Sequence, residues 1–243
     1  MSVTVPAIFL ALAFVWFALP LVVRRIGIGH LTRVCATRRA IVLTYDDGPG
    51  EMVTAAVVDR LARRGTHATF FLIGREAIAR PGVVARLVEQ GHEIGNHTQE
   101  HRNAWKSVPW VTVRDIRAGR RSLDRLAVPP GPFRPPFGKV TLATLAEIWR
   151  SRQPLAFWTL DSRDSWENPR PIPEVLAKLE AQGGGVVLMH DRDAPPRARP
   201  GHDHRRHVLA LTEAILDMAA LKGFAVLRFC DLEEASKFNP TRR

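Results

Sequence analysis

Short blocks of apolar and polar residues alternate from Ala40 onward, and they predict alternating strands and helices. Seven blocks are rich in branched and aromatic residues, as is typical of strands. The predicted strands are Ala40–Thr44, Ala68–Leu72, Glu93–Asn96, a short piece at Phe133, Leu155–Thr159, Val186–Met189 and Phe224–Leu227. Between them, apolar residues recur at helical spacing, and glycines end several of the segments. The predicted helices are Val53–Arg64, Gly82–Gln90, Val111–Leu126, Leu142–Arg150, Pro173–Ala181 and His207–Leu221.

This alternation, with short connections, predicts an α/β fold with a parallel sheet and right-handed crossovers. About seven such units predict an incomplete (β/α) barrel of about seven parallel strands. An open doubly wound sheet is the alternative. Both arrangements bring the C-terminal ends of the strands, and the residues that follow them, to one edge.

An apolar run without charged residues spans Val3–Val23. At ~1.5 Å per residue it is just long enough to cross a bilayer. It lacks a preceding basic region and a clear small-residue cleavage site, which favours an uncleaved anchor over a signal peptide. We therefore predict one N-terminal transmembrane helix within an anchor at residues 1–25. Arg24 and Arg25 follow the span and favour a cytoplasmic position for the rest of the chain.

The remaining chain is predicted to form a weakly structured basic connection at residues 26–38, one globular domain at 39–232 and a basic tail at 233–243. The sequence has 243 residues, of which 46% are hydrophobic and 24% charged, enough for one large α/β domain. The segment Asp191–Arg206 is rich in Pro, Arg, Asp and His and predicts an exposed loop.

Charge and cysteine content restrict the function classes only moderately. The net charge of +11 suits anionic partners, but the basic residues are scattered rather than gathered with aromatics, so we expect no nucleic-acid partner. Cys35 and Cys230 are too few for a disulfide scaffold, and the sequence does not show whether they pair. The sequence does not indicate an oligomeric state.

Two adjacent carboxylates end the first predicted strand. Apolar residues from Ile41 run into Asp46 and Asp47, and Gly48 and Pro49 then stop the strand. Neighbouring carboxylates repel each other, so both remain ionised easily only beside a cation, for which a bound metal is the obvious candidate. An Asp-Gly turn that closes a hairpin is the alternative.

Two histidines follow the third predicted strand. His97 and His101 are four residues apart, so on a helical turn both rings can reach one ion. Because parallel strands direct their C-terminal ends to one edge, this pair is expected near Asp46 and Asp47. Two histidines and one carboxylate form a three-ligand site with an open position, and such a metal can lower the pKa of a bound water to roughly 7. The second aspartate is then free to accept a proton.

Three further groups follow later strands. Arg134 is held among prolines and can orient a carboxylate through paired hydrogen bonds. His190 ends the sixth strand, and with an aspartate such as Asp164 in reach it can remain protonated as a general acid. A surface arginine and a buried structural histidine are the alternative interpretations.

Five motifs in this order resemble the polysaccharide deacetylase family, carbohydrate esterase family 4, which contains the nodulation-type chitooligosaccharide deacetylase homology domain. The resemblance covers about residues 39–232 and implies a distorted, incomplete (β/α) barrel as a catalytic domain. The motifs are Thr44-Tyr45-Asp46-Asp47-Gly48-Pro49, His97-Thr98-Gln99-Glu100-His101, Arg134-Pro135-Pro136-Phe137-Gly138, Asp161-Ser162-Arg163-Asp164-Ser165-Trp166 and Leu188-Met189-His190.

The resemblance assigns roles to these residues. It implies that Asp46 is the catalytic base, that Asp47, His97 and His101 bind the metal, and that Arg134 orients the base. It also implies that His190 is the catalytic acid, partnered by Asp164. The Phe137 backbone N–H is expected to help hold the oxyanion. Ser165 is inserted between Asp164 and Trp166 relative to the family pattern, and this insertion affects the expected position of Trp166 as a wall of the sugar site. The expected substrate and oxyanion residues are Tyr45, Phe137, Trp166 and Leu188.

Together, residues and resemblance predict a metal-dependent hydrolase that removes an N-acyl group, with acetyl as the first choice, from an amino sugar in a polysaccharide or oligosaccharide. The expected cofactor is one divalent metal ion, zinc by default and cobalt or nickel as alternatives. A deacetylase or deformylase of a lipid-linked amino sugar at the membrane surface is one alternative. A catalytically inactive glycan-binding protein on the same fold is another. The charge pattern favours the cytoplasmic side of the membrane, whereas the family's habit favours the outside.

Overall fold

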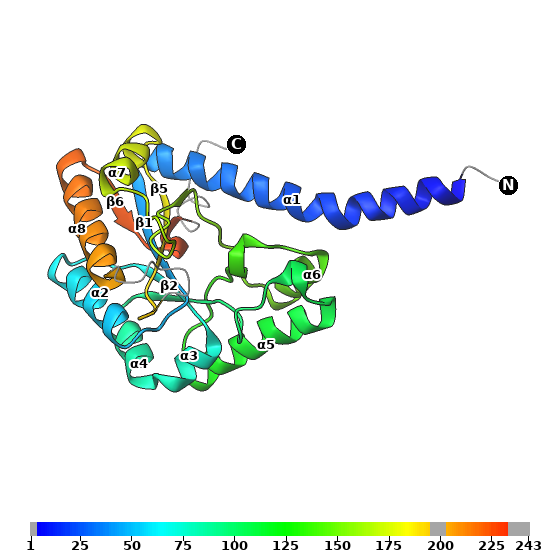
Figure 1. Ribbon diagram of the computed structural model, residues 1–243, viewed down its shortest axis with the longest axis horizontal. Helices are drawn as coiled ribbons and strands as arrows, with labels where there is room; N and C mark the ends of the chain where they lie inside the picture. The colour runs from blue at the N-terminus through cyan, green and yellow to red at the C-terminus, as the bar shows by residue number, and fades with distance from the viewer. Residues whose placement is uncertain (1–3, 195–202, 233–243) are drawn as a thin grey trace, which may run out of the picture.

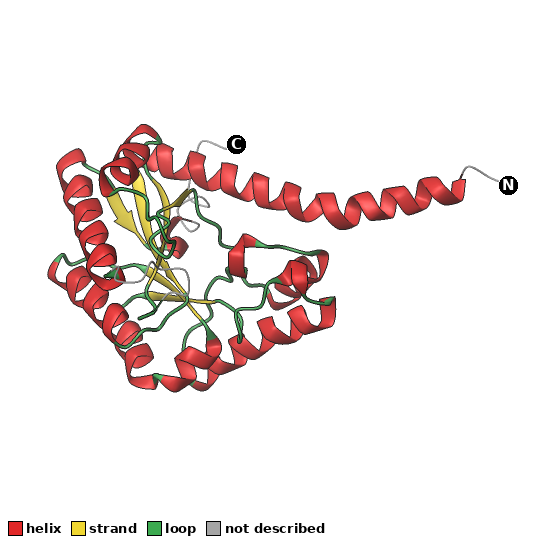
Figure 2. Cartoon of the chain, in the orientation of Figure 1, coloured by secondary structure: helices red, strands yellow, loops and turns green. Residues whose placement is uncertain are grey.

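The computed structural model describes residues 4–194 and 203–232, and its centre is a parallel sheet. The hydrogen-bonded order is β3-β2-β1-β5-β4, and β6 also pairs with β1. Helices surround this sheet (Figures 1 and 2). The strands are β1 (Ala40–Asp46), β2 (Thr69–Leu72), β3 (Glu93–Asn96), β4 (Leu160–Asp161), β5 (Gly185–His190) and β6 (Ala225–Leu227).

The fully buried central strand β1 has neighbours along both of its edges. Along one edge it pairs with β5, and Asp46 lies opposite His190 in that register. Along the other edge, its first half pairs with β6 and its second half with β2. A strand buried on both faces needs a nearly continuous apolar sequence, which the first residues of β1 provide.

Side-chain alternation along β1 separates two apolar cores. Ile41, Leu43 and Tyr45 pack in the larger core, which includes residues of α2 (Met52–Arg63) and α8 (His204–Lys222). Ala40 and Val42 lie in the second core. Because side chains of a strand alternate between its faces, Thr44 and Asp46 belong to the side opposite Tyr45.

The other helices agree with the predicted segments within a few residues at most ends. The prediction missed α3, a single short helix that directly precedes α4. The remaining helices are α3 (Gly74–Ala79), α4 (Pro81–Glu89), α5 (Pro109–Arg125), α6 (Leu142–Ser151) and α7 (Ile172–Ala181), with short 3-10 turns η1 (Ala104–Lys106) and η2 (Pro136–Gly138).

The parallel α/β sheet is confirmed, but the strand count needs correction. In the described ranges the sheet has six strands, and its pairings do not close it into a barrel. Phe133 and Leu155 form only isolated parallel bridges that extend the edge at β3. The predicted strand Leu155–Thr159 is replaced by the two-residue strand β4, because only Leu160 and Asp161 continue the ladder with β5.

The N-terminal segment forms one helix, α1 (Thr4–Arg38), which extends away from the body at its N-terminal end (Figure 1). Its second half carries four arginines, and Leu31 and Cys35 are buried in the second core. Within the portion of the chain that the structure describes, no helix combines the length and apolar character that a membrane crossing requires. The predicted single-pass anchor at 1–25 is therefore wrong. The weakly structured connection at 26–38 is wrong as well, because the helix continues through it and packs on the sheet.

Two other predictions need comment. Cys35 and Cys230 are both free thiols, so they do not pair. The predicted exposed loop Asp191–Arg206 begins with a fully buried Asp191, and its last residues belong to α8. Residues 195–202 of that loop and the predicted tail at 233–243 lie outside the described residues.

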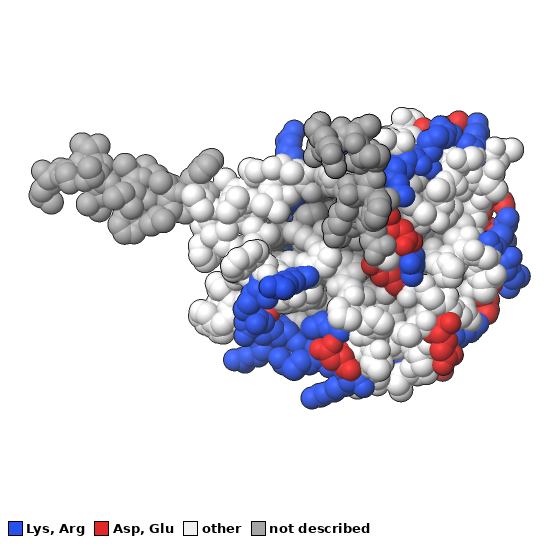
Figure 3. Space-filling view, turned by 180° about the vertical axis from the view of Figure 1, so that it is seen from behind, with Lys and Arg blue, Asp and Glu red and all other residues white. Residues whose placement is uncertain are grey.

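One group of basic residues lies on the side of α5 and α6. The view from behind shows Lys and Arg side chains clustered on the side of α5 and α6, with acidic side chains between basic ones elsewhere (Figure 3). On these helices the exposed arginines include Arg114, Arg117, Arg121, Arg125 and Arg150. The positive net charge is therefore partly local rather than evenly scattered.

Candidate metal centre and active site

Polar side chains from several strand ends surround one cavity of about 660 Å³. Asp46 ends β1, His190 ends β5, and His97 directly follows β3. The parallel strands all direct their C-terminal ends to this edge of the sheet. The cavity is lined by Asp46, Asp47, His97, His101, Asn103, Lys106, Phe137, Lys139, Trp158, Asp161, Ser165, Trp166, Leu188, His190 and Arg192.

Asp47, His97 and His101 form a three-residue cluster that can hold a metal ion. One oxygen or nitrogen atom from each lies within 4.8 Å of the others. Asp47 Oδ1 is 3.0 Å from His101 Nε2 and 3.5 Å from His97 Nε2. This buried oxygen nevertheless has no partner in hydrogen-bonding geometry among the described residues. Three donor atoms that face one another without hydrogen bonding fit a shared cation, and two histidines with one carboxylate suit zinc and its neighbours.

The hydrogen bonds around the histidines support this arrangement. His97 Nδ1 lies 2.7 Å from the carbonyl oxygen of Arg134, so Nδ1–H donates there and leaves Nε2 free to bind an ion. Burial and the nearby His97 lower the pKa of His101 to about 3, so its ring is neutral. Burial would raise the pKa of Asp47, but its interactions with His97 and His101 hold it well below its ordinary value. The cluster therefore offers one carboxylate and, at His101, a neutral imidazole.

Three site residues have backbone conformations that are uncommon outside glycine. The φ angles are 70° at Asp47, 55° at His101 and 57° at Phe137. Residues with side chains adopt this left-handed region at an energetic cost, which the surrounding structure must offset. Such conformations often occur at functional sites, and here they place one side chain from each of three loops at the same cavity.

Arg134 fixes Asp46 from beneath the cavity. Its guanidinium is fully buried and lies 3.9 Å from the Phe71 ring centroid. Nη1 donates hydrogen bonds to Asp46 Oδ1 at 2.8 Å and to Thr44 Oγ1 at 2.7 Å. Its Nη2 donates to the Phe157 carbonyl at 3.1 Å. Asp46 Oδ2 remains 3.7 Å from His97 Nε2. One carboxylate oxygen of Asp46 is thus engaged by the arginine, and the other faces the metal cluster.

His190, which lines the cavity, pairs with the fully buried Asp164. His190 Nδ1 lies 2.9 Å from Asp164 Oδ1, and the His190 backbone N–H donates to Asp164 Oδ2 at 2.7 Å. Burial alone would lower the pKa of His190, but the Asp164 carboxylate outweighs it and raises the pKa to about 10. The same pairing overcomes burial at Asp164 and lowers its pKa. The His190 ring is therefore cationic at neutral pH.

Two supporting residues were missed by the sequence analysis. Ser162 Oγ donates to Asp164 Oδ1 at 2.9 Å. His204 lies beneath the pair, with Nε2 3.1 Å from the His190 carbonyl oxygen and Nδ1 3.3 Å from the Asp164 carbonyl oxygen. Ser162 lies inside the motif that also contains Asp164. His204 starts a helix far along the chain and carries no local signal for this role.

The predicted substrate residues divide into two groups. Phe137, Trp166 and Leu188 all line the cavity, so the inserted Ser165 does not remove Trp166 from it. Tyr45 does not reach the cavity. Its ring stacks on Phe70 in the larger core, and its hydroxyl is 2.8 Å from Thr212 Oγ1. The alternation of side chains along β1 explains this placement.

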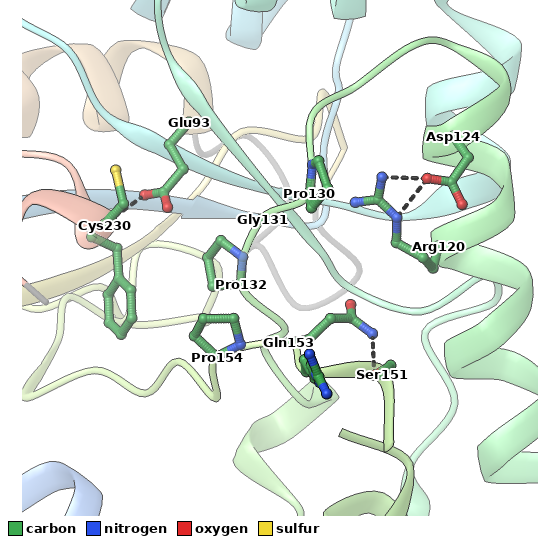
Figure 4. A pocket seen from close by; sticks show the side chains of 12 residues that line it. Glu93, Arg120, Asp124, Pro130, Gly131, Pro132, Ser151, Gln153, Pro154 and Cys230 are labelled. Carbon is green, nitrogen blue, oxygen red and sulfur yellow. Dashed lines mark hydrogen bonds and ion pairs between the residues drawn. The ribbon is translucent and has the colours of Figure 1, made fainter. Parts of the chain in front are cut away.

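A second cavity, of about 340 Å³, is separate from this chemistry (Figure 4). It lies near the start of β3, where Glu93 accepts hydrogen bonds from Thr69 Oγ1 and the Cys230 backbone N–H. On its other side Arg120 pairs with Asp124. Its charged groups are thus engaged with one another, and the candidate metal ligands lie elsewhere.

The polysaccharide deacetylase family model matches residues 33–151. A peptidoglycan-N-acetylglucosamine deacetylase of Bacillus cereus is 32% identical over 215 residues, which cover 86% of this chain and 94% of the relative. This chain belongs to the polysaccharide deacetylase family. The membership confirms the resemblance that its motifs carry.

Other family members agree in fold or sequence over different lengths. The peptidoglycan-N-acetylglucosamine deacetylase PgdA of Listeria monocytogenes is 35% identical over 156 residues, which cover 64% of this chain and 33% of the relative. The chain therefore spans about a third of that protein's length. The crystal structure of a peptidoglycan N-acetylglucosamine deacetylase superposes with a TM-score of 0.70 and 25% identity, covering 81% of this chain and 89% of the other.

Proposed function

We propose that this protein is a metal-dependent hydrolase that removes the N-acetyl group from an amino sugar of the N-acetylglucosamine type in a glycan. The observation that carries the proposal is the presence, on one cavity, of the Arg134-bound Asp46, the Asp47–His97–His101 cluster and the His190–Asp164 pair. The relatives named above are similar proteins described as deacetylases of N-acetylglucosamine in peptidoglycan.

In this proposal Asp47, His97 and His101 hold one divalent metal ion, zinc by default and cobalt or nickel as alternatives. When bound, such an ion polarises an acyl carbonyl and acidifies water. Asp46 accepts the proton of the attacking water through Oδ2, while Arg134 holds Oδ1 and keeps the carboxylate oriented. The Phe137 backbone N–H is proposed as a donor to the oxygen of the tetrahedral intermediate.

His190, the register neighbour of Asp46 on β5, is proposed as the acid. Its proton goes to the sugar nitrogen as the carbon–nitrogen bond breaks, so the products are acetate and the free amine. Asp164 holds the ring through Nδ1 at 2.9 Å and directs the proton-bearing Nε2 away from itself. Trp166 and Leu188 are proposed to contact the sugar.

An inactive glycan-binding protein on the same fold is the rival from another class. A binding module has no use for both a buried base and a paired histidine acid, and this chain keeps both. Asp46 and Asp164 are buried carboxylates that pair with Arg134 and His190. The two pairs reach one cavity through Asp46 and His190, which favours catalysis over simple binding.

The test compares two neighbouring aspartates on N-acetylglucosamine oligomers and peptidoglycan fragments, with free amine and acetate measured by mass spectrometry. Asp46→Asn should keep the metal while kcat falls by roughly 10²–10⁴. Asp47→Asn should lower the bound metal measured by elemental analysis. Chelation of the unmodified protein should abolish activity without global unfolding, and returning zinc should restore it. If both variants retain full activity, or if Asp46→Asn loses the metal while Asp47→Asn keeps it, these roles are wrong.

A further inference from the structure

An apolar groove of about 580 Å³ adjoins the candidate active site. Its size is within the range of roughly 300–1,000 Å³ that is usual for small-molecule sites. One wall comes from α1, through Trp16, Pro20 and Leu21, and the other from residues around η1 and η2, including Trp105, Val108 and Val140. Trp16, Leu21, Trp105 and Val108 are each 45–55% exposed, so the groove presents large apolar side chains to its opening.

Residues that are neighbours in the chain line the groove and the catalytic cavity. Trp105 and Val140 line the groove, whereas their chain neighbours Lys106 and Lys139 line the catalytic cavity. The indole Nε1 of Trp105 donates to the Val140 carbonyl at 3.0 Å, and Lys139 Nζ lies 4.0 Å from the Trp105 ring centroid. These contacts hold the segments 105–106 and 139–140 together as one ridge. A molecule that crosses the ridge passes from a polar, metal-binding cavity into an apolar groove.

Positive charge lies along this ridge. Lys106 and Lys139 form no ion pair with any residue that the structure describes, and the Arg24 side chain on α1 lies next to Gly138. Ammonium groups without a carboxylate partner, at the border between the cavity and the groove, suit an anion, for which phosphate is the usual ligand chemistry.

The chemistry of the groove argues against a continuing sugar chain as its occupant. Its described lining has no charged side chain, and it contains aliphatic residues such as Leu21, Val108 and Val140. Sugar hydroxyls buried there would lose water without gaining enough hydrogen bonds, which is costly. An alkyl chain would gain from the same burial.

We propose that this protein accepts an amphiphilic substrate, an N-acetylated amino sugar joined through a phosphate to a long alkyl or isoprenoid chain. This inference rests on the proposed deacetylase activity and names the substrate class of the same site. The sugar occupies the cavity beside Asp47, His97 and His101, the phosphate lies at Lys106 and Lys139, and the chain lies in the groove between α1 and η1.

The test uses metal-loaded protein and a series of N-acetylglucosaminyl phosphate esters with methyl, decyl and farnesyl groups. A neutral decyl glycoside of N-acetylglucosamine and soluble N-acetylglucosamine oligomers complete the series. Release of acetate gives kcat/KM for each compound. We expect kcat/KM to rise by up to about fourfold for each methylene that the groove buries, and to be higher for the decyl phosphate ester than for the neutral glycoside.

Two matched variants on α1 distinguish an effect of the groove from a general effect of changing this helix. Leu21 lines the groove, whereas Leu19, also about half exposed at 44%, does not. Leu21→Ser should reduce the gain from methyl to farnesyl at least severalfold, and Leu19→Ser should preserve it. Lys139→Gln should lower kcat/KM for the decyl phosphate ester by about tenfold, the usual size of a charge-assisted contact, with a smaller effect on the neutral glycoside.

The outcomes distinguish the inference from the proposed function. Hydrolysis of the oligomers and the methyl ester with no gain from longer chains would overturn the amphiphilic substrate and leave the deacetylase proposal standing. An equal loss of the chain-length gain in Leu21→Ser and Leu19→Ser would also overturn it. No hydrolysis of any compound by metal-loaded protein would instead contradict the deacetylase activity.

Discussion

The pairing of His190 with Asp164 makes a quantitative prediction about alkaline pH. With the carboxylate present, the pKa of His190 is raised to about 10, against an ordinary value of 6.5. Asp164→Asn removes the largest of the charges that oppose burial, so this pKa should fall toward its ordinary value of 6.5. At about pH 8.5 an imidazole with that pKa is protonated in about 1% of molecules, whereas a ring with a pKa near 10 is almost fully protonated. If His190 is the acid, kcat/KM should therefore fall about a hundredfold at this pH.

The assay is the pH profile of kcat/KM for deacetylation of N-acetylglucosamine oligomers. In the unmodified protein the activity attributed to His190 is present below its raised pKa and disappears as the pH rises through it. The matched control is Asp161→Asn, a carboxylate that lines the same cavity and accepts from the Arg163 N–H. That variant should keep the alkaline limb in place. An unchanged alkaline limb in Asp164→Asn would refute the assignment of His190 as an acid controlled by Asp164.

Two other substitutions test the placement of residues around β1. Arg134→Met leaves Asp46 buried without its cationic partner, so chemical denaturation should show that the free energy of unfolding falls by about 3–5 kcal/mol. The control Arg86→Met, at the exposed pair with Asp59, should lower it by no more than about 1 kcal/mol. Similar losses in both variants would contradict the structural role of Arg134. Tyr45→Phe removes the hydrogen bond to Thr212 and should lower the free energy of unfolding by about 0.5–1.5 kcal/mol, with kcat/KM unchanged. A large loss of kcat/KM in a stable variant would show that Tyr45 acts in the active site.

Sequence reasoning predicted the strand ends well because their signals are local. An apolar run followed by Asp46, Asp47, Gly48 and Pro49 contains both the strand and its end. Because parallel strands end at the same edge, the position of His97 at that edge could be predicted without the strand order. The order itself is not local, and the pairing of Asp46 with His190 depends on β5, which is remote in sequence.

The misplaced residues show where local patterns fail. Tyr45 was grouped with the substrate residues because it lies inside a motif, although its alternation with Thr44 and Asp46 already placed it on the other face. His204 could not be found, because its contacts with His190 and Asp164 arise only after α8 folds back on the cavity. In α1, an apolar run predicted a membrane span, but the helix continues to Arg38 and its second half packs into the body.

Arg134 serves as a common reference point for two parts of the candidate site. Its side chain holds Asp46 at 2.8 Å, and its carbonyl oxygen holds His97 Nδ1 at 2.7 Å. The proposed base and one proposed metal ligand are therefore tied to the same residue. This shared partner sets the spacing between the proposed proton acceptor and the proposed metal ligand. It also means that a backbone shift at residue 134 affects both groups at once.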